Sequence, residues 1–148
     1  MEDLAKSLSY NYVFRGLPPD VVNGFAALAE VKDYMGGDVL MRQFDYNSDL
    51  VILLEGQARI KSFTGETIAE FGPGSILGEI SLIDEQPRSA TVVAIGPVKA
   101  AVISASVLRG MMETDSKTSA TMLLNICRVL CRRLRTMNVH VDALSKEA

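Results

Sequence analysis

Short apolar runs separated by turn residues fill positions 31–103, and this pattern limits the choice of fold more than any other feature of the chain. The run Leu50 to Leu54 is continuously apolar, and Val98 to Ile103 is mostly so. Gly36-Gly37-Asp38 and Gly72-Pro73-Gly74 are turn signals between such runs. Many short strands with glycine-rich turns are typical of a β-sandwich or a jelly-roll barrel.

Helical patterns lie on both sides of this region. Pro18-Pro19-Asp20 predicts a helix start, because proline is tolerated in the first turn. Ser104 is a candidate N-cap for a short helix to about Glu113, and a long helix is expected from about Ser116 onward. We therefore expect one mainly β domain over residues 1–148, a β-barrel or jelly roll (double-stranded β-helix). Its expected parts are a helical N-terminal segment (1–30), the barrel (31–103) and C-terminal helices (104–148).

Composition narrows the classes of function. The formal net charge is −3 and the pI is about 5.2, which argues against direct nucleic-acid binding, since that needs a basic face. No apolar run approaches the roughly 20 residues of a membrane span. The first residues, Met1-Glu2-Asp3-Leu4, lack the basic and apolar regions of a signal peptide. We expect a cytoplasmic protein without membrane contact.

The residues needed for catalysis or metal binding are sparse. His140 is the one histidine, and Cys127 and Cys131 supply only two soft ligands at helical spacing. We expect no catalytic residues and no metal site, hence not an enzyme, with both thiols buried in an apolar stripe. A basic stretch in the same helix is expected to form a solvated face; it comprises Arg128, Arg132, Arg133 and Arg135.

Two apolar stripes run along the long C-terminal helix. The first alternates in steps of four and three, which is an a/d heptad seam, and comprises Leu123, Cys127, Leu130, Leu134, Met137, Val141 and Leu144. The second comprises Met122, Ile126 and Val129. One stripe can cover the barrel while the other pairs with a second chain, which favours a homodimer. The alternative is that both stripes cover the barrel.

Residues 78–91 place three chemically complementary groups around one short loop between strands. The carboxylate of Glu79 can accept hydrogen bonds from sugar hydroxyls, and the guanidinium of Arg88 can hold a phosphate with a planar fork of donors. Ser89 adds a hydroxyl and a backbone N–H. Backbone N–H groups of a tight turn or helix start add anion contacts. This segment can therefore hold a compact sugar phosphate.

The same segment resembles the phosphate-binding cassette of the cyclic nucleotide-binding domain family. It begins Gly78-Glu79-Ile80-Ser81-Leu82 and ends Pro87-Arg88-Ser89-Ala90-Thr91, at the separation usual for the family. The resemblance implies that Glu79 binds the ribose 2′-hydroxyl and that Arg88 and Ser89 bind the phosphate. It further implies contacts from Gly78, Ile80, Ser81 and Ala90, and a barrel flanked by helices.

No motif in the sequence specifies which nucleotide base is bound. Similarity of Cys131-Arg132-Arg133-Leu134 to catabolite activator-type regulators places Met137 and Asn138 at base-contacting positions, with a solvated Asn138 as the alternative. A hydroxyl after the arginine, as in Ser89, can favour cGMP in some relatives. Activator-type proteins carry serine there and respond to cAMP. We expect the ligand to be cAMP, with cGMP possible.

Together these features predict a regulatory module in which ligand binding repositions the C-terminal helices and controls an effector domain or partner protein. The chain contains no effector motif, and a regulatory piece of a longer protein is favoured over a complete small sensor. The main alternative is a ligand-independent dimerisation or scaffold module with a degenerate cassette. One departure from the family concerns residues 42–49, a loop that usually contains glycines and here has none.

Overall fold

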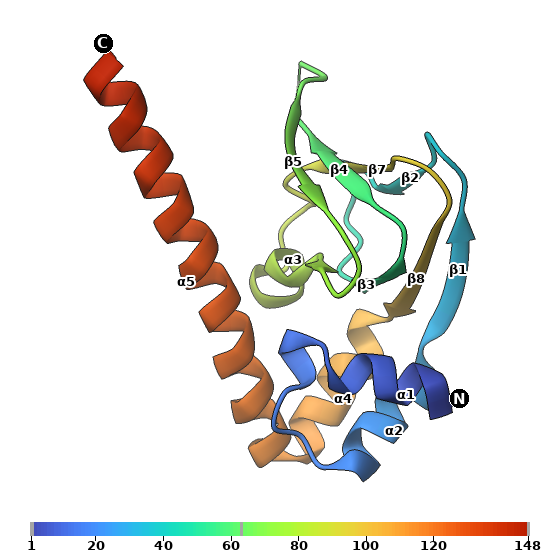
Figure 1. Ribbon diagram of the computed structural model, residues 1–148. Coiled ribbons are helices and arrows are strands. Elements are labelled where there is room, and N and C mark those ends of the chain that lie inside the picture. Colours follow the sequence, from blue (N-terminus) through green and yellow to red (C-terminus); the bar gives the residue numbers. More distant parts are fainter. Residues whose placement is uncertain (1, 63, 148) are drawn as a thin grey trace.

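A computed structural model describes residues 2–62 and 64–147, which form two β-sheets with helices at one end (Figure 1). The helices are α1 (Glu2–Ser9), the 3₁₀ helix η1 (Tyr12–Phe14), α2 (Pro19–Leu28), α3 (Glu79–Asp84), α4 (Ala105–Thr114) and α5 (Ser116–Glu147). The strands are β1 (Glu30–Tyr34), β2 (Val39–Met41), β3 (Leu50–Glu55), β4 (Ala58–Lys61), β5 (Thr67–Phe71), β6 (Ile76–Leu77), β7 (Thr91–Ala94) and β8 (Val98–Ile103).

The strands divide into two antiparallel sheets. One has the order β1-β8-β3-β6 and the other β2-β7-β4-β5, with Ile52 opposite Ala101 in the first and Ile60 opposite Val92 in the second. The neighbouring strands β7 and β8 lie in different sheets, as in a jelly roll. The predicted fold class is therefore confirmed with one correction: the two sheets are not closed into a barrel.

Two apolar clusters explain why β3 is apolar without interruption. Val51 and Leu53 point between the sheets toward Leu77 and Val92, whereas Leu50 and Ile52 point toward the helices. Successive side chains of a strand face opposite sides, so a strand covered on both sides is apolar throughout. The helix-side cluster also contains Phe14 and Phe25 of the N-terminal helices, Leu108 of α4, and Met122 and Ile126 of α5.

The predicted helix starts agree with the structure. Pro18 precedes α2, and the hydroxyl of Ser104 accepts a hydrogen bond from the N–H of Val107 at 3.2 Å. Buried Asn125 in α5 donates to the carbonyls of Val13 and Arg15 at 2.9 and 2.8 Å. These two bonds fasten the first half of α5 to η1.

The second half of α5 extends away from the rest of the molecule (Figure 1). Met122 and Ile126 are buried, while Leu134, Val141 and Leu144 are each more than half exposed. The second stripe therefore covers the body of the protein, and the far part of the heptad seam faces solvent. No helix in the described part of the chain is long and apolar enough to cross a membrane.

The expectation of buried thiols is wrong. Cys127 and Cys131 are both exposed and free. Burial in α5 follows Met122 and Ile126, and the cysteines lie outside that row.

Candidate functional site

The segment 78–91 contains a short helix, which the expectation of a plain loop between two strands missed. Strand β6 ends at Leu77, Gly78 turns the chain with φ 92°, and α3 begins at once with Glu79. The helix ends at Asp84, and the next residue, Glu85, adopts φ 58°. The backbone therefore places the carboxylate of Glu79 in the first turn of α3.

Gly78 is required here for two reasons. Its positive φ disfavours any residue with a Cβ. An added Cβ would also lie 2.5 Å from Nη1 of Arg88 and 2.6 Å from the carbonyl oxygen of Asp49. The missing side chain therefore makes room for the guanidinium of Arg88, in addition to any close approach of a ligand.

Arg88 is a buried cation whose hydrogen-bond partners are neutral. Its Nη2 donates to the carbonyl of Asp49 at 2.7 Å and to Oδ1 of Asn47 at 3.4 Å, and its Nη1 donates to the carbonyl of Gly78 at 3.3 Å. Its side chain is 3% exposed. No carboxylate within the described residues forms an ion pair with it. Buried charges are normally paired, so the geometry suits an anionic ligand at this point.

The electrostatic environment of Arg88 agrees with this geometry. Burial lowers the pKa of Arg88 below its ordinary value, and the negative charges of Asp49, Glu79 and Asp45 oppose that shift. Arginine nevertheless stays protonated at neutral pH, because its ordinary pKa is so high. Arg88 therefore remains a positive charge at the edge of the cassette.

The loop without glycine, residues 42–49, holds the backbone of Arg88. The N–H of Arg88 donates to the carbonyl of Asp45 at 2.8 Å, and the carbonyl of Arg88 accepts from the N–H of Phe44 at 2.9 Å. Phe44 adopts φ 74°, the conformation that a glycine would take without strain. The chain thus makes the tight turn with a non-glycine residue, and the loop still reaches the cassette.

Glu79 is the other buried charge. Its side chain is 1% exposed, and its Oε2 has no hydrogen-bond partner among the described residues. Its Oε1 accepts from Nη1 of Arg133 in α5. An unpaired buried carboxylate oxygen costs about 1–3 kcal/mol or more, so Oε2 is the natural acceptor for a ligand hydroxyl.

Arg133 is a site residue that the sequence reasoning missed, because it was assigned to a solvated face. Besides Glu79 it contacts the carbonyl of Ile76 through Nη2 at 3.0 Å, and its guanidinium lies 5.5 Å from the ring centroid of Phe71. A signal was available. Met122, Ile126 and Val129 follow one another in steps of four and three, and position 133 is the next in that row.

Most of the predicted ligand residues share one pocket, which we call the cassette pocket. It measures about 420 Å³, including space open to solvent. Its lining comprises Met41, Ile60, Leu77, Gly78, Glu79, Ile80, Ser81, Ser89, Ala90, Val92 and Arg133. Ser81 is buried and Ser89 is exposed, so Ser89 has the more accessible hydroxyl. Arg88 lies directly beside this pocket, in contact with Gly78.

A larger apolar hollow, the α5 groove, lies between the sheets and the C-terminal helix. It measures about 1610 Å³ and includes Phe71, Ile80, Leu130, Leu134 and Met137 in its lining. Ile60, Ile80 and Arg133 line both hollows, so the two lie side by side. Met137 is thus placed beside the groove, whereas Asn138 is exposed and lines neither hollow.

The family model described as the cyclic nucleotide-binding domain matches residues 31–115, which include the whole cassette and, apart from Glu30 at the start of β1, both sheets. The chain belongs to the cyclic nucleotide-binding domain family.

Relatives and solved structures agree with this assignment. The chain is 28% identical over 139 residues to the cyclic AMP receptor protein of Thermus thermophilus, covering 91% of this chain and 62% of that protein. It is 32% identical over 97 residues to a cAMP-dependent protein kinase regulatory subunit of Yarrowia lipolytica. That alignment covers 66% of this chain and 26% of the regulatory subunit. A cyclic nucleotide-binding domain from Methylobacillus flagellatus superposes with TM-score 0.78 at 27% identity. The superposition covers 91% of this chain and 78% of that domain.

The catabolite activator protein of Thermus thermophilus superposes with TM-score 0.76 at 27% identity. That alignment covers 91% of this chain and 63% of the activator. The chain therefore spans less than two thirds of the length of this relative.

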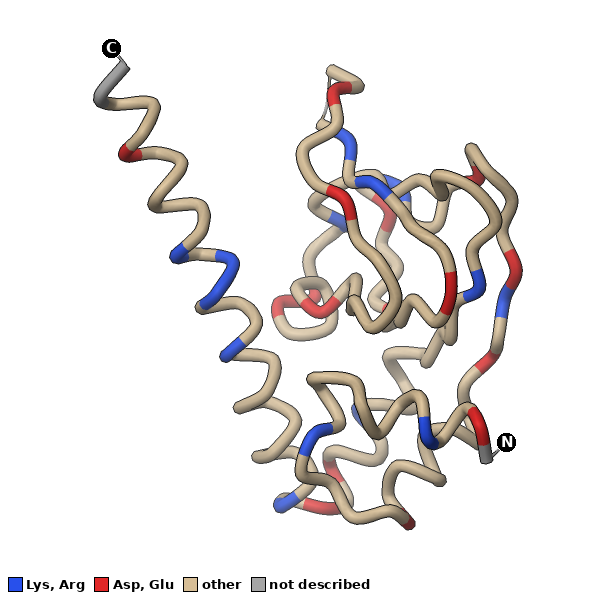
Figure 2. Tube along the Cα trace, viewed as in Figure 1, with Lys and Arg blue, Asp and Glu red and all other residues tan. Residues whose placement is uncertain are grey.

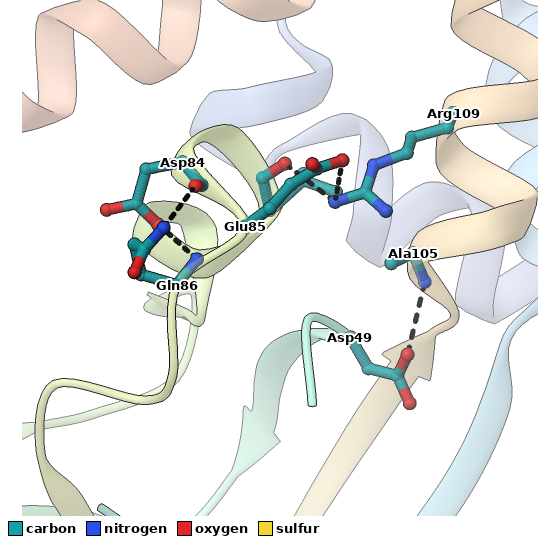
Figure 3. A network of polar contacts seen from close by, with 7 residues as sticks. Asp49, Asp84, Glu85, Gln86, Ala105 and Arg109 are labelled. Carbon is teal, nitrogen blue, oxygen red and sulfur yellow. Dashed lines mark hydrogen bonds and ion pairs between the residues drawn. The ribbon is translucent and has the colours of Figure 1, made fainter. Parts of the chain in front are cut away.

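Polar contacts fasten the domain's cassette to α4 (Figure 3). Nη2 of Arg109 donates to the carbonyl of Leu82 at 3.2 Å and lies 3.3 Å from Oε1 of Glu85. Oδ1 of Asp49 accepts from the N–H of Ala105 at 3.1 Å. Since the carbonyl of Asp49 also accepts a hydrogen bond from Arg88, one residue links this arginine to the start of α4.

Metal ligands do not gather in the domain. Among residues 2–62 and 64–147 there is no group of three or more histidine, cysteine, aspartate or glutamate side chains placed to hold a metal ion. The polar side chains that line the cassette pocket are one carboxylate (Glu79), one guanidinium (Arg133) and two serine hydroxyls, and the guanidinium of Arg88 lies beside them.

Proposed function

We propose that this chain binds a cyclic nucleotide in the cassette pocket and acts as a regulatory sensor. The observation that carries the proposal is the burial of Arg88 with neutral hydrogen-bond partners only, since a cyclic phosphate can pair directly with this guanidinium. Glu79 lies in the adjacent first turn of α3 with a free carboxylate oxygen for the ribose 2′-hydroxyl.

The remaining cassette residues have supporting roles in this proposal. Ser89 offers its hydroxyl and N–H to the phosphate, and its exposure makes both accessible. Gly78 and Ala90 have small or no side chains and so leave room for the ligand, and Ile80 gives the sugar an apolar contact. Ser81 is a buried residue of α3 that lines the same pocket.

We propose cAMP as the preferred ligand, with cGMP as the weaker one. Matched relatives include a cyclic AMP receptor protein and several cAMP-dependent kinase regulatory subunits, although a cGMP-dependent protein kinase from Plasmodium berghei is also 28% identical over 117 residues. The base would enter the α5 groove, where Met137 provides an apolar surface. Asn138 would reach the base only after α5 moves, because it lies outside the groove.

Movement of α5 is the proposed signal. Arg133 occupies Oε1 of Glu79, so a ribose hydroxyl arriving at Glu79 changes the environment of a side chain on α5. A ligand shifts a conformational equilibrium only through different affinity for the two states, and this shared carboxylate supplies such a difference. The Arg109 and Asp49 contacts offer a second connection, from the cassette to α4.

The exposed seam of α5 is the proposed dimer contact. Leu134, Met137, Val141 and Leu144 are 53–67% exposed and repeat at heptad spacing, so pairing with a second copy would bury them. Output would pass through this helix to an effector domain or partner protein. The free thiols are consistent with the reducing cytoplasm as the compartment of action.

Calorimetric titration of nucleotide-free protein with cAMP and with cGMP tests this function. Saturable binding of one nucleotide per chain, tighter for cAMP, is expected. Tighter cGMP binding would overturn the base preference alone. An absence of binding to both, in protein shown to be nucleotide-free, would overturn the sensor proposal in favour of a scaffold module.

A further inference from the structure

Two free thiols stand on the surface of α5, and the proposed nucleotide site makes no use of them. Cys127 and Cys131 are exposed and lie four residues apart in one continuous helix. Residues at this spacing are neighbours on a helix surface, with Cβ atoms about 5–6 Å apart. The two sulfur atoms can therefore reach toward one shared ligand.

This spacing is too wide for a disulfide within the helix. A disulfide needs Cβ atoms about 3.8 Å apart, and a mismatch of this size stores strain. A metal ion inserted between two sulfur atoms forms a longer bridge, with metal–sulfur bonds of about 2.3 Å each for ions of this size. The geometry therefore disfavours a disulfide between these two residues of one helix and suits an ion held between two thiolates.

We propose that Cys127 and Cys131 form a binding site for Cu(I), a soft cation that accepts two thiolate ligands. Thiolates select Cu(I), whereas a structural zinc site needs four protein ligands. The described residues contain no group of three or more potential ligands, so the site has two protein ligands.

Neighbouring arginines supply the charge balance. Arg128 and Arg135 lie three residues before and four residues after Cys131, so both flank it on the helix surface. Both are exposed, and neither forms an ion pair within the part of the chain that the structure describes. Figure 2 shows basic residues gathered along this stretch of α5.

The binding step is an exchange of protons for metal. Two thiols release two protons to solvent and form two Cu–S bonds, and copper remains Cu(I) throughout. The resulting bis-thiolate complex carries one negative charge, which the adjacent guanidinium groups offset. No oxidant or reductant takes part in the step.

The test is competition for Cu(I) between the protein and bicinchoninate, without oxygen, with three cysteine variants: C127S, C131S and the double variant. The full chain is expected to bind one Cu(I). Each single variant should bind at least about 100-fold more weakly, because the second thiol no longer acts as an intramolecular ligand. Both side chains are exposed, so circular dichroism should show the variants folded.

A matched pair of charge variants adds a second readout. The double variant Arg128→Gln with Arg135→Gln should bind Cu(I) several-fold more weakly, still with one ion per chain. The control is Arg42→Gln, which removes an exposed arginine from the β2–β3 loop and should leave the Cu(I) affinity unchanged. Equal affinity of the single cysteine variants and the full chain would overturn the site. A stoichiometry of one ion per two chains would also overturn it, since the thiols would then come from different molecules.

Discussion

The guanidinium of Arg133 in α5 forms an ion pair with the buried carboxylate of Glu79 in α3, across 54 residues of sequence. Helix α5 is otherwise fastened to the body mainly through its first half, where Met122, Asn125 and Ile126 are buried. The ion pair therefore joins the cassette directly to the outer half of the helix.

Removing this contact should loosen α5. Arg133→Gln is expected to raise hydrogen exchange of α5 amides beyond residue 129 on the order of tenfold, because a charged hydrogen bond contributes about 1–2 kcal/mol at a partly exposed site. Hydrogen-exchange mass spectrometry measures the effect. The control is Arg135→Gln, which removes an exposed arginine without an ion pair among the described residues. Equal exchange in the two variants would show that the pair does not hold the helix.

The close packing of Gly78 against Arg88 predicts a selective loss of binding. Gly78→Ala should lose nucleotide binding, since its Cβ would lie 2.5 Å from Nη1 of Arg88. Gly65→Ala is the matched control: it has φ 91°, against 92° at Gly78, but no atom within 4 Å of the added Cβ. Both variants should lose about 1 kcal/mol or more of folding free energy from backbone strain. Calorimetry on the two folded variants separates strain from the site, and normal affinity in Gly78→Ala would contradict the assignment.

Asp115 gives a prediction about acid stability. Hydrogen bonds from the side chain and backbone of Thr118 lower the pKa of Asp115 below its ordinary 3.8. A lowered folded-state pKa means that the carboxylate stabilises the folded chain above pH 3.8 and loses this effect as pH falls through the folded-state pKa.

The melting temperature of Asp115→Ala should therefore lie below that of the unmodified protein near neutral pH, and the gap should narrow below pH 3.8. Glu113→Ala, which removes an exposed acidic residue from the end of α4, is the control. A gap that widens with acidification would contradict the stabilising role of the Asp115 carboxylate.

Dimerisation through the seam predicts different effects of two neighbouring substitutions. Val141 lies on the seam and Val139 lies off it, although both are exposed, 53% and 68%. Val141→Glu should weaken self-association at least about tenfold, because a buried valine contributes about 1.5–3 kcal/mol and two like charges would meet. Val139→Glu should associate like the unmodified protein. Analytical ultracentrifugation measures the self-association of both variants. Equal self-association of Val141→Glu and Val139→Glu would contradict pairing through this seam.

Local sequence signals predicted several helices and strands well. The cap at Ser104, the proline start of α2 and the unbroken apolar run of β3 each correspond to an observed element. These signals depend on neighbouring residues alone, so a single sequence contains them.

Contacts between distant segments were harder to predict. The pairing of Arg133 with Glu79 depends on where α5 crosses the cassette, which no local pattern specifies. The exposure of Cys127 and Cys131 has the same origin, since only the tertiary packing decides which stripe of α5 meets the body. The helix within the cassette was missed because its six residues, Glu79–Asp84, are too few for a periodic pattern.

The most direct test of the account is the cAMP affinity of Arg88→Ala, measured by calorimetry on nucleotide-free protein beside Arg128→Ala as a control and Arg88→Lys as the charge-conserving variant. Losing a desolvated charge partner costs about 2–5 kcal/mol, so Arg88→Ala should bind at least about 30-fold more weakly. Arg88→Lys should also bind weakly, because an ammonium group lacks the planar fork of donors. Unchanged cAMP affinity in folded Arg88→Ala would contradict the central claim that this buried arginine binds the cyclic phosphate.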